Sequence, residues 1–182
     1  MKFDKNNDKK YWFVMRDLKR SNAKTPAYKL LENLKMDYFV PMKWKMIEHN
    51  GSKTRKKIPV IQDLLFVHEK KEKLDLIVKK TPTLQYRYMR GAGYCCPMVV
   101  DVAEMTRFIT AVNASDSPVY YLPGEVDAQY VGSKVRIMGG PMDGFEGILQ
   151  DVSGTRKKRF LVELSNLLIV SVEVNVDYFE VL

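Results

Sequence analysis

Apolar and polar positions alternate with two different periods along the first 115 residues, and these periods predict strands and helices in turn. Residues 11–18, YWFVMRDL, form an aromatic and apolar run that predicts a largely buried strand. In residues 25–35 the apolar positions recur at every third or fourth residue, which predicts a helix with one buried face. Thr25 is expected to cap the N-terminus of this helix, with Pro26 in its first turn.

Residues 37–69 predict a long hairpin. In residues 37–48 methionine and tryptophan fall on one face of the expected strand and lysines on the other, a period of two. Asn50-Gly51 lies at the centre of the expected turn, and the apolar run 58–69 is expected to return as the second strand.

Two more helices and one strand are expected before residue 115. Residues 69–80 predict a short amphipathic helix, and residues 84–94 a strand with a glycine-rich turn. Residues 101–115 predict a helix that begins at a capping-box-like pair. That pair is Asp101 and Glu104, and the expected buried stripe is Val102, Met105, Ile109 and Val112, with Phe108 beside it. The order of these elements predicts an α/β (α+β) sandwich, an antiparallel-rich sheet with helices packed against it.

The pattern changes after about residue 115. Residues 116–130 contain prolines, glycines and acidic residues without a helical period, which predicts a linker. From 131 to 182 every apolar run is short and strand-like, and five strands joined by tight turns predict a small all-β, SH3-like barrel. We therefore expect a flexible tail at 1–10, an α/β domain at 11–115 and a barrel domain at 131–182.

Positive charge is concentrated in the first third of the chain. The 182 residues carry a formal net charge of +8; residues 1–57 hold 16 Lys/Arg against 6 Asp/Glu, and residues 58–182 hold 14 against 16. This asymmetry favours a partner that carries phosphates or an acidic surface. The alternative is a solvated, lysine-rich surface with no specific partner.

The sequence contains none of the common catalytic or metal-binding motifs. The only cysteines, Cys95 and Cys96, are too few for a structural zinc site and are expected to be thiols in a reducing cytoplasm. His49 and His68 have no partner motif, and there is no phosphate-binding loop or nucleophile motif. We expect no enzymatic activity, no cofactor and no metal. Without a long apolar run or a signal-peptide core, the protein is expected to be cytoplasmic and not membrane-bound.

A dense glycine motif carries the first resemblance. Residues 132–147 fit the pattern G-x-x-V-x-I-x-x-G-P-x-x-G-x-x-G. The Gly-Gly-Pro segment at 139–141 suits a tight turn, and Gly147 suits a bulge or close packing at a barrel corner. This segment resembles the KOW motif, which is found in NusG-type transcription factors and in some ribosomal proteins.

The first half resembles the N-terminal (NGN) domain of the NusG family. The strand YWFVMRDL resembles the opening strand of that domain, and RKKIPVIQDLLFV resembles its later strand pattern. VKKTPTLQYRYMRG resembles its Thr-Pro hairpin, and CPMVVDVAEMTRFI its last helix. The resemblance spans about residues 11–182. It implies a transcription elongation factor that binds RNA polymerase and suppresses pausing or termination without catalysing a reaction.

Departures from the family pattern favour a specialised paralogue. Gln62-Asp63 occupies the position of a usual Pro-Gly, Leu64 replaces an aromatic residue, and the loop around Asn166 lacks a common glycine. The resemblance therefore points to a bacterial, operon-specific antiterminator like RfaH or those of capsular polysaccharide operons.

The resemblance also implies site residues. The β′ clamp helices of RNA polymerase are expected to contact Trp12, Phe13, Ile61 and Leu64. The alternative for each of these four is an ordinary core position. Non-template DNA or nascent RNA is expected to contact the basic residues near the first helix and the Thr-Pro hairpin, which are Lys19, Arg20, Lys24, Lys80, Thr81, Arg87 and Arg90.

The partner of the KOW domain stays open between two kinds of protein. In NusG this domain binds a small-subunit ribosomal protein or the termination factor Rho, and the matching loop here holds Leu167 and Leu168. Both leucines could instead close the barrel core. The rival hypothesis for the whole chain is a ribosome-associated or RNA-binding KOW protein that does not contact polymerase.

Overall fold

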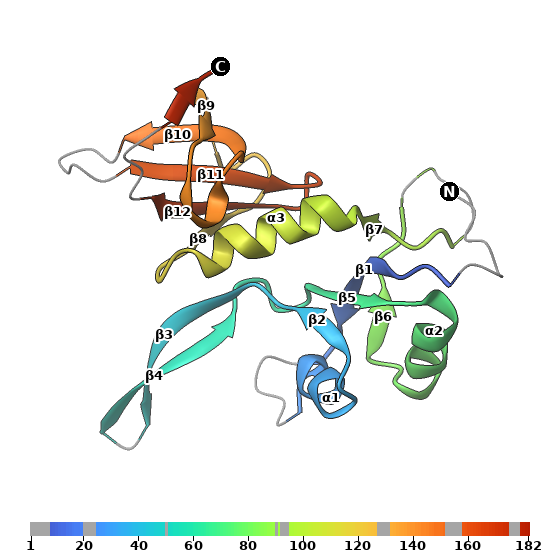
Figure 1. Cartoon of the computed structure of the whole chain (residues 1–182). Coiled ribbons are helices and arrows are strands. Elements are labelled where there is room, and N and C mark those ends of the chain that lie inside the picture. The colour runs from blue at the N-terminus through green and yellow to red at the C-terminus, as the bar shows by residue number, and fades with distance from the viewer. Residues whose placement is uncertain are drawn as a thin grey trace. The chain divides into compact units, whose positions relative to one another are not determined.

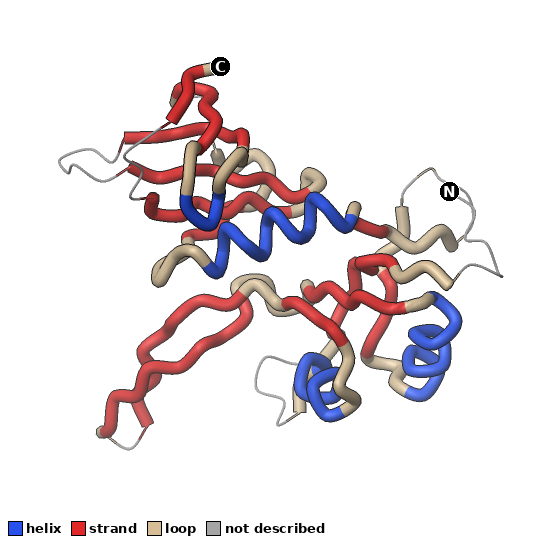
Figure 2. The backbone as a smooth tube through the Cα atoms, viewed as in Figure 1, coloured by secondary structure: helices blue, strands red, loops and turns tan. Residues whose placement is uncertain are grey.

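The chain folds into two compact units, Met1–Val102 and Ala103–Leu182. The structure is a computed structural model, and it describes residues 8–19, 25–49, 51–89, 91, 95–126, 132–151, 158–174 and 179–182. Figure 1 shows the order of the elements within each unit, and Figure 2 shows that strands make up most of the second unit.

The first unit is built on an antiparallel sheet. Its strand order is β2 (Asp37–Phe39), β5 (Leu65–Glu69), β1 (Tyr11–Asp17) and β6 (Leu84–Tyr86), and β7 (Val99–Val100) also pairs with β1. Helices α1 (Ala27–Asn33) and α2 (Lys71–Lys80) pack on one face. The side chains between sheet and helices alternate along the strands, as the period of two predicted. They include Phe13, Met15, Leu65, Val67, Leu74, Leu31, Leu84 and Tyr86.

The long hairpin predicted at 37–69 is present, but its expected turn at 49–57 was too long, because β4 (Ser52–Pro59) already begins there and pairs with β3 (Met42–His49). Asn50 lies outside the described residues. The hairpin is also interrupted at residues 40 and 41. The interruption separates β2, which pairs with β5, from β3, which pairs with β4. Strands β3 and β4 form a two-stranded sheet of their own. In Figure 1 this sheet extends away from the sheet of the first unit. We call it the ribbon, residues 42–59.

The sequence predicted that Thr25 caps helix α1, but the structure does not confirm this. Pro26 is the N-cap residue, and it makes no side-chain capping bond. The buried Asp17 at the end of β1 replaces it, because its carboxylate accepts from the Ala27 N–H at 2.6 Å and from the Lys19 N–H at 3.0 Å. A residue ten positions upstream thus stabilises the helix start.

The second unit consists of a six-stranded sheet and most of helix α3 (Val102–Asn113). The strand order is β13-β9-β10-β11-β12-β8. In chain order the strands are β8 (Val119–Tyr121), β9 (Ser133–Ile137), β10 (Glu146–Asp151), β11 (Lys158–Leu164), β12 (Leu168–Val174) and β13 (Phe179–Val181), with a 3₁₀ turn, η1, at Gly140–Met142. The five strands predicted between 131 and 182 are all present.

Two boundaries differ from those predicted. The expected linker at 116–130 contains β8, which pairs with β12 and so adds a sixth strand to the sheet. The expected end of the first domain at 115 is also displaced, because α3 from Ala103 onward groups with the second unit. Hydrogen bonds support this grouping: the Glu104 carboxylate accepts from Ser165, and the Arg107 guanidinium donates to the Glu146 carbonyl at 3.1 Å.

Helix α3 is also rotated relative to the predicted stripe. Its buried residues are Met105, Phe108 and Ala111, whereas Val102 is exposed and Ile109 and Val112 are half-buried. The apolar period predicted the helix correctly. The face that is buried, however, is displaced by about one residue from the predicted one.

Candidate functional site

The four residues predicted to contact polymerase do not form one exposed apolar surface. Trp12 and Phe13 are consecutive in β1 and therefore point to opposite faces of the sheet. Phe13 belongs to the core beneath the helices, while Trp12 stacks on His68 with ring centroids 4.9 Å apart. The exposed fractions of Trp12, Phe13 and Leu64 are 6%, 0% and 2%. Ile61 is half-buried, so only its side chain has substantial surface to offer.

Ile61 lies in a turn, residues 60–64, that is held in place by polar contacts. Asp63 is the centre of these contacts, because its two carboxylate oxygens pair with Arg16 Nε and Arg87 Nη2, each at 3.2 Å. The Val60 N–H donates to the Pro41 carbonyl at 2.8 Å and ties the turn to the base of the ribbon. Asp63 thus joins the turn to β1 and to the segment after β6 through two ion pairs.

Arg87 has a structural role in this network. Its guanidinium is committed to Asp63, its main-chain N–H donates to the Val14 carbonyl at 2.9 Å, and its Nε is buried without a hydrogen-bond partner among the described residues. A phosphate contact through Nη2 would compete with the Asp63 pair. The predicted nucleic-acid role of Arg87 therefore competes with a structural one.

The other predicted nucleic-acid residues fall into two groups. Arg20, Lys24 and Arg90 lie outside the described residues. Lys19 and the Lys80-Thr81 pair are brought to one end of the sheet, because the Leu18 N–H donates to the Thr83 carbonyl at 2.8 Å. Lys80 is exposed and Thr81 is half-buried at the end of α2. The end of β1 and the Thr-Pro turn are thus neighbours, as a shared binding surface requires.

Lys19 also lies at the edge of a groove of about 1170 Å³ within the first unit. One side of the groove is formed by the start of α1, and the other side by the ribbon. Its floor contains apolar residues of the segment between β2 and β3 and of the turn before β5, among them Val40, Val60 and Leu65. Lysines line it on both sides: Lys19, Lys29, Lys43, Lys45, Lys56 and Lys57. The sequence indicated the charge of these segments but not that they enclose one groove.

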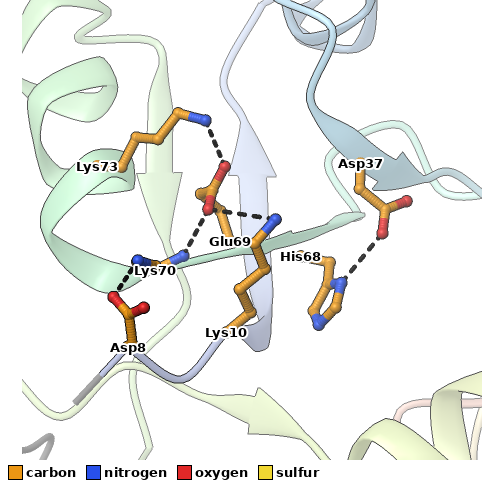
Figure 3. A network of polar contacts seen from close by, with 7 residues as sticks. All are labelled: Asp8, Lys10, Asp37, His68, Glu69, Lys70 and Lys73. Atoms are coloured by element: carbon orange, nitrogen blue, oxygen red, sulfur yellow. Dashed lines mark hydrogen bonds and ion pairs between the residues drawn. The ribbon is translucent and has the colours of Figure 1, made fainter.

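A second polar cluster holds the start of the described chain against α2 (Figure 3). The buried Glu69 carboxylate accepts from Lys73 Nζ at 2.6 Å and the Lys70 N–H at 3.0 Å, and Lys10 Nζ lies 3.6 Å away. Burial by itself raises the pKa of Glu69, but these hydrogen bonds and cations outweigh it and lower the pKa below its usual value. Lys70 also pairs with Asp8, so part of the segment expected to be a free tail makes contacts.

The two leucines predicted to bind a KOW partner have different environments. Leu168 is buried at the start of β12 and belongs to the core, whereas Leu167 is half-buried in the turn between β11 and β12. Ser165 and Asn166 in that turn have positive φ values of 46° and 57°. Asparagine tolerates this conformation, which explains how the turn forms without the glycine of the family pattern.

The glycines of the KOW-like motif have distinct backbone reasons. Gly139, Gly140 and Gly144 have φ values of 88°, 73° and 74°, which side-chain-bearing residues rarely adopt. Gly147 has ordinary backbone angles, but a Cβ there would lie 2.5 Å from the Leu161 carbonyl oxygen and 2.6 Å from the Phe160 ring. The motif is therefore a set of backbone requirements of this sheet.

A groove of about 530 Å³ lies between α3 and the sheet of the second unit. Glu104 and Arg107 of the helix line it, opposite Glu146, Gly147 and Ile169. Arg107 also lies over the Phe145 ring, 5.2 Å from its centroid. The local sequence pattern did not indicate this groove, because it depends on α3 packing against a sheet formed by distant residues.

Among the described residues no group of three or more His, Cys, Asp or Glu side chains could hold a metal ion. Within the same part of the chain, none of the helices combines the length and the apolar character needed to cross a bilayer.

Comparisons with known proteins find likenesses among solved structures. No family model matches the sequence, and no curated protein matches it. Among solved structures, one that is similar along nearly the whole chain is a structure of NusG from Thermotoga maritima, described as showing domain interaction. The TM-score is 0.47 and the sequence identity 17%, over 96% of this chain and 98% of that one. The function is therefore inferred from the residues of the chain itself.

Proposed function

We propose that this chain is a NusG-like transcription elongation factor, with an NGN-type first unit and a KOW-type second unit, that binds RNA polymerase and suppresses pausing or termination. The observation that carries the proposal is the glycine motif at 132–147, whose resemblance to KOW is specific and whose glycines each meet a backbone requirement. The resemblance of the first half to the NGN domain adds the polymerase contact, which a KOW motif alone does not imply.

The proposed polymerase contact is the turn at residues 60–64, with Ile61 as its apolar anchor. The partner is the clamp helices of β′, as in the family. Trp12, Phe13 and Leu64 are left out of the proposed contact, because they are buried in this conformation. Asp63 holds the turn through two arginines, so the anchor is presented on a rigid element.

A factor that acts in this way binds polymerase and does not need to catalyse a reaction. A factor that binds one conformation of the polymerase clamp more tightly than another shifts the population toward it. Contacts from Lys19 and from the Thr-Pro turn to non-template DNA or nascent RNA would strengthen the complex in a salt-dependent way. The Asp63 network and the Ser165-Asn166 turn, which replace family glycines, support an operon-specific paralogue over a housekeeping factor.

The proposed partner of the second unit is a small-subunit ribosomal protein or Rho. Of the two leucines predicted to bind it, Leu167 is the proposed contact, because Leu168 is in the core. Ser165, in the turn that carries Leu167, also donates its N–H and its hydroxyl to the Glu104 carboxylate of α3.

The polymerase contact is tested by Ile61→Glu, with Gln62→Glu as the matched control. Both variants add one negative charge to the same turn, but Gln62 is exposed and Ile61 is half-buried. We expect Ile61→Glu to lose co-purification with bacterial RNA polymerase core enzyme, and Gln62→Glu to keep it. Equal retention of the two variants, with circular dichroism confirming that both are folded, would remove the turn from the proposal.

The second candidate function is an RNA-binding or ribosome-associated KOW protein that does not contact polymerase. The burial of Trp12, Phe13 and Leu64 favours it, because the surface expected for the clamp helices is smaller than the sequence predicted. Affinity purification from nuclease-treated lysate separates the two. Recovery of ribosomal subunits without polymerase would support the second candidate, and recovery of polymerase subunits the first.

A further inference from the structure

The ribbon is unusual because apolar side chains remain exposed on a two-stranded sheet. A two-stranded ribbon buries little surface and is marginally stable by itself. Trp44 and Met46 are nevertheless 44% and 58% exposed, and every described residue from Ser52 to Lys57 is exposed as well. Packing within the chain does not account for a tryptophan at this position.

The ribbon also carries a large excess of positive charge. Its one acidic residue is Glu48, against six basic residues: Lys43, Lys45, Lys53, Arg55, Lys56 and Lys57. None of these six cations has a carboxylate within 4.0 Å in the described part of the chain. Lys45 and Lys56 lie directly opposite each other in the ladder, an arrangement that destabilises a sheet. A bound polyanion would remove this repulsion.

The aromatic and basic side chains are placed together on one face. Trp44 lies opposite Lys57 in the ladder, and Met46 lies opposite Arg55. The Arg55 guanidinium is 4.4 Å and the Lys57 ammonium 5.1 Å from the centroid of the Trp44 ring. Both cations lie over the ring, and the ring keeps 44% of its surface exposed. The exposed part of the ring can stack on a nucleic-acid base, and the neighbouring cations can reach the flanking phosphates.

The groove described above is lined by residues from both faces of the ribbon. Trp44 and Lys57 line it together with Lys45 and Lys56, and Lys29 of α1 adds another cation. Six lysines line the groove against two acidic residues, Asp17 and Glu48. Several cations around one groove suit a strand of linked phosphates better than a compact anion.

We propose that the ribbon and its groove bind single-stranded nucleic acid, with Trp44 stacked on a base and the lysines along the groove neutralising phosphates. A single strand fits better than a duplex, because duplex bases are already stacked and do not offer their faces to a side chain. RNA and DNA share this chemistry. This binding does not require polymerase, so it can be tested with oligonucleotides alone.

The stacking contact is tested with the full-length chain and fluorescein-labelled 12-nucleotide RNA and DNA, by fluorescence anisotropy. We expect Trp44→Ala to weaken binding roughly 10- to 100-fold, and Trp44→Phe to recover much of the loss. In a Trp12→Phe background Trp44 is the only tryptophan, and its emission is expected to be quenched as the oligonucleotide binds. A preference for RNA or for DNA identifies the natural strand, and either supports the proposal.

The phosphate contacts are tested by the salt dependence of binding. Lys45→Gln/Lys56→Gln is expected to reduce the slope of log affinity against log salt by about 1.4, which is two phosphate contacts on a single strand. The matched control, Lys79→Gln/Lys134→Gln, removes the same charge from α2 and from β9. Its slope is expected to stay close to that of the unchanged chain.

Three results would overturn the proposal. Trp44→Ala could bind as tightly as the unchanged chain, which would leave only non-specific charge attraction. A 12-base-pair duplex could compete as well as the single strand. Phosphatidylglycerol vesicles could blue-shift Trp44 emission while oligonucleotides leave it unchanged, which would make the ribbon a contact for anionic lipid.

Discussion

The strongest structural prediction concerns Gly147→Ala. The added Cβ would lie 2.5 Å from the Leu161 carbonyl oxygen and 2.6 Å from the Phe160 ring, both closer than non-bonded atoms approach. Neither neighbour can move freely. The carbonyl belongs to the strand that pairs with β10, and the Phe160 ring is fully buried in the second unit.

The expected cost follows from this geometry. Over-packing a well-packed core costs about 1–3 kcal/mol, and the rigid carbonyl places Gly147→Ala at the upper end of that range. Replacing glycine by alanine in a strand recovers about 0.5–1 kcal/mol through the lower entropy of the unfolded chain. The net loss is therefore expected to be about 2 kcal/mol.

Hydrogen exchange of the full-length chain measures the loss of stability within the second unit, where Gly147 lies. Both tryptophans, Trp12 and Trp44, lie in the first unit, so tryptophan fluorescence does not report on the second. Mass spectrometry of peptides from β10 and β11 gives the free energy of local opening in the variant and the unchanged chain.

A control separates steric overlap from backbone strain. Gly144 has a φ of 74° and open space where a Cβ would lie, so Gly144→Ala costs only the left-handed conformation, about 1–2 kcal/mol. Phe160→Leu in the Gly147→Ala background is expected to recover part of the loss, but not in the Gly144→Ala background. Protection in Gly147→Ala equal to that of the unchanged chain would refute the close approach.

Two further predictions concern the first unit. Asp17→Ala is expected to lower the free energy of unfolding by about 1–3 kcal/mol, because the Ala27 N–H loses a buried charged acceptor; urea denaturation followed by Trp12 fluorescence in a Trp44→Phe background measures it, and an unchanged midpoint would contradict the capping role. The lowered pKa of Glu69 means that its carboxylate stabilises the fold above its usual pKa of about 4.5, and that this stability is lost as the pH falls through the lower, folded-state pKa. Glu69→Gln is therefore expected to be less stable at pH 7 and to lose less stability between pH 5 and pH 2; parallel pH profiles of the two proteins would exclude this role.

Local patterns predicted most of the elements correctly. The period of two in residues 37–48 predicted β3, and the apolar spacing in residues 69–80 predicted α2, whereas most of β4 had been expected as part of the turn. The glycine motif predicted the tight turns after β9. These features depend on neighbours in sequence, through backbone sterics and side-chain direction, so a pattern of a few residues is enough to specify them.

Other features depend on contacts between distant residues, which no local pattern contains. The hydrophobic side chains at Trp12, Phe13 and Leu64 could have formed a binding surface or a core, and only packing of the sheet decided that they are buried. The cap of α1 by Asp17 is decided in the same way, because it joins residues from different elements.

The chain's sequence by itself indicated most of the strands and helices, the glycines that the turns require, and the concentration of positive charge in the first third. The tertiary structure decided which face of each element is buried, that α3 packs with the second unit, and that scattered lysines line one groove beside an exposed tryptophan. The physical reason is that side-chain period is a local property, whereas burial and charge clustering depend on which segments meet after the chain has folded.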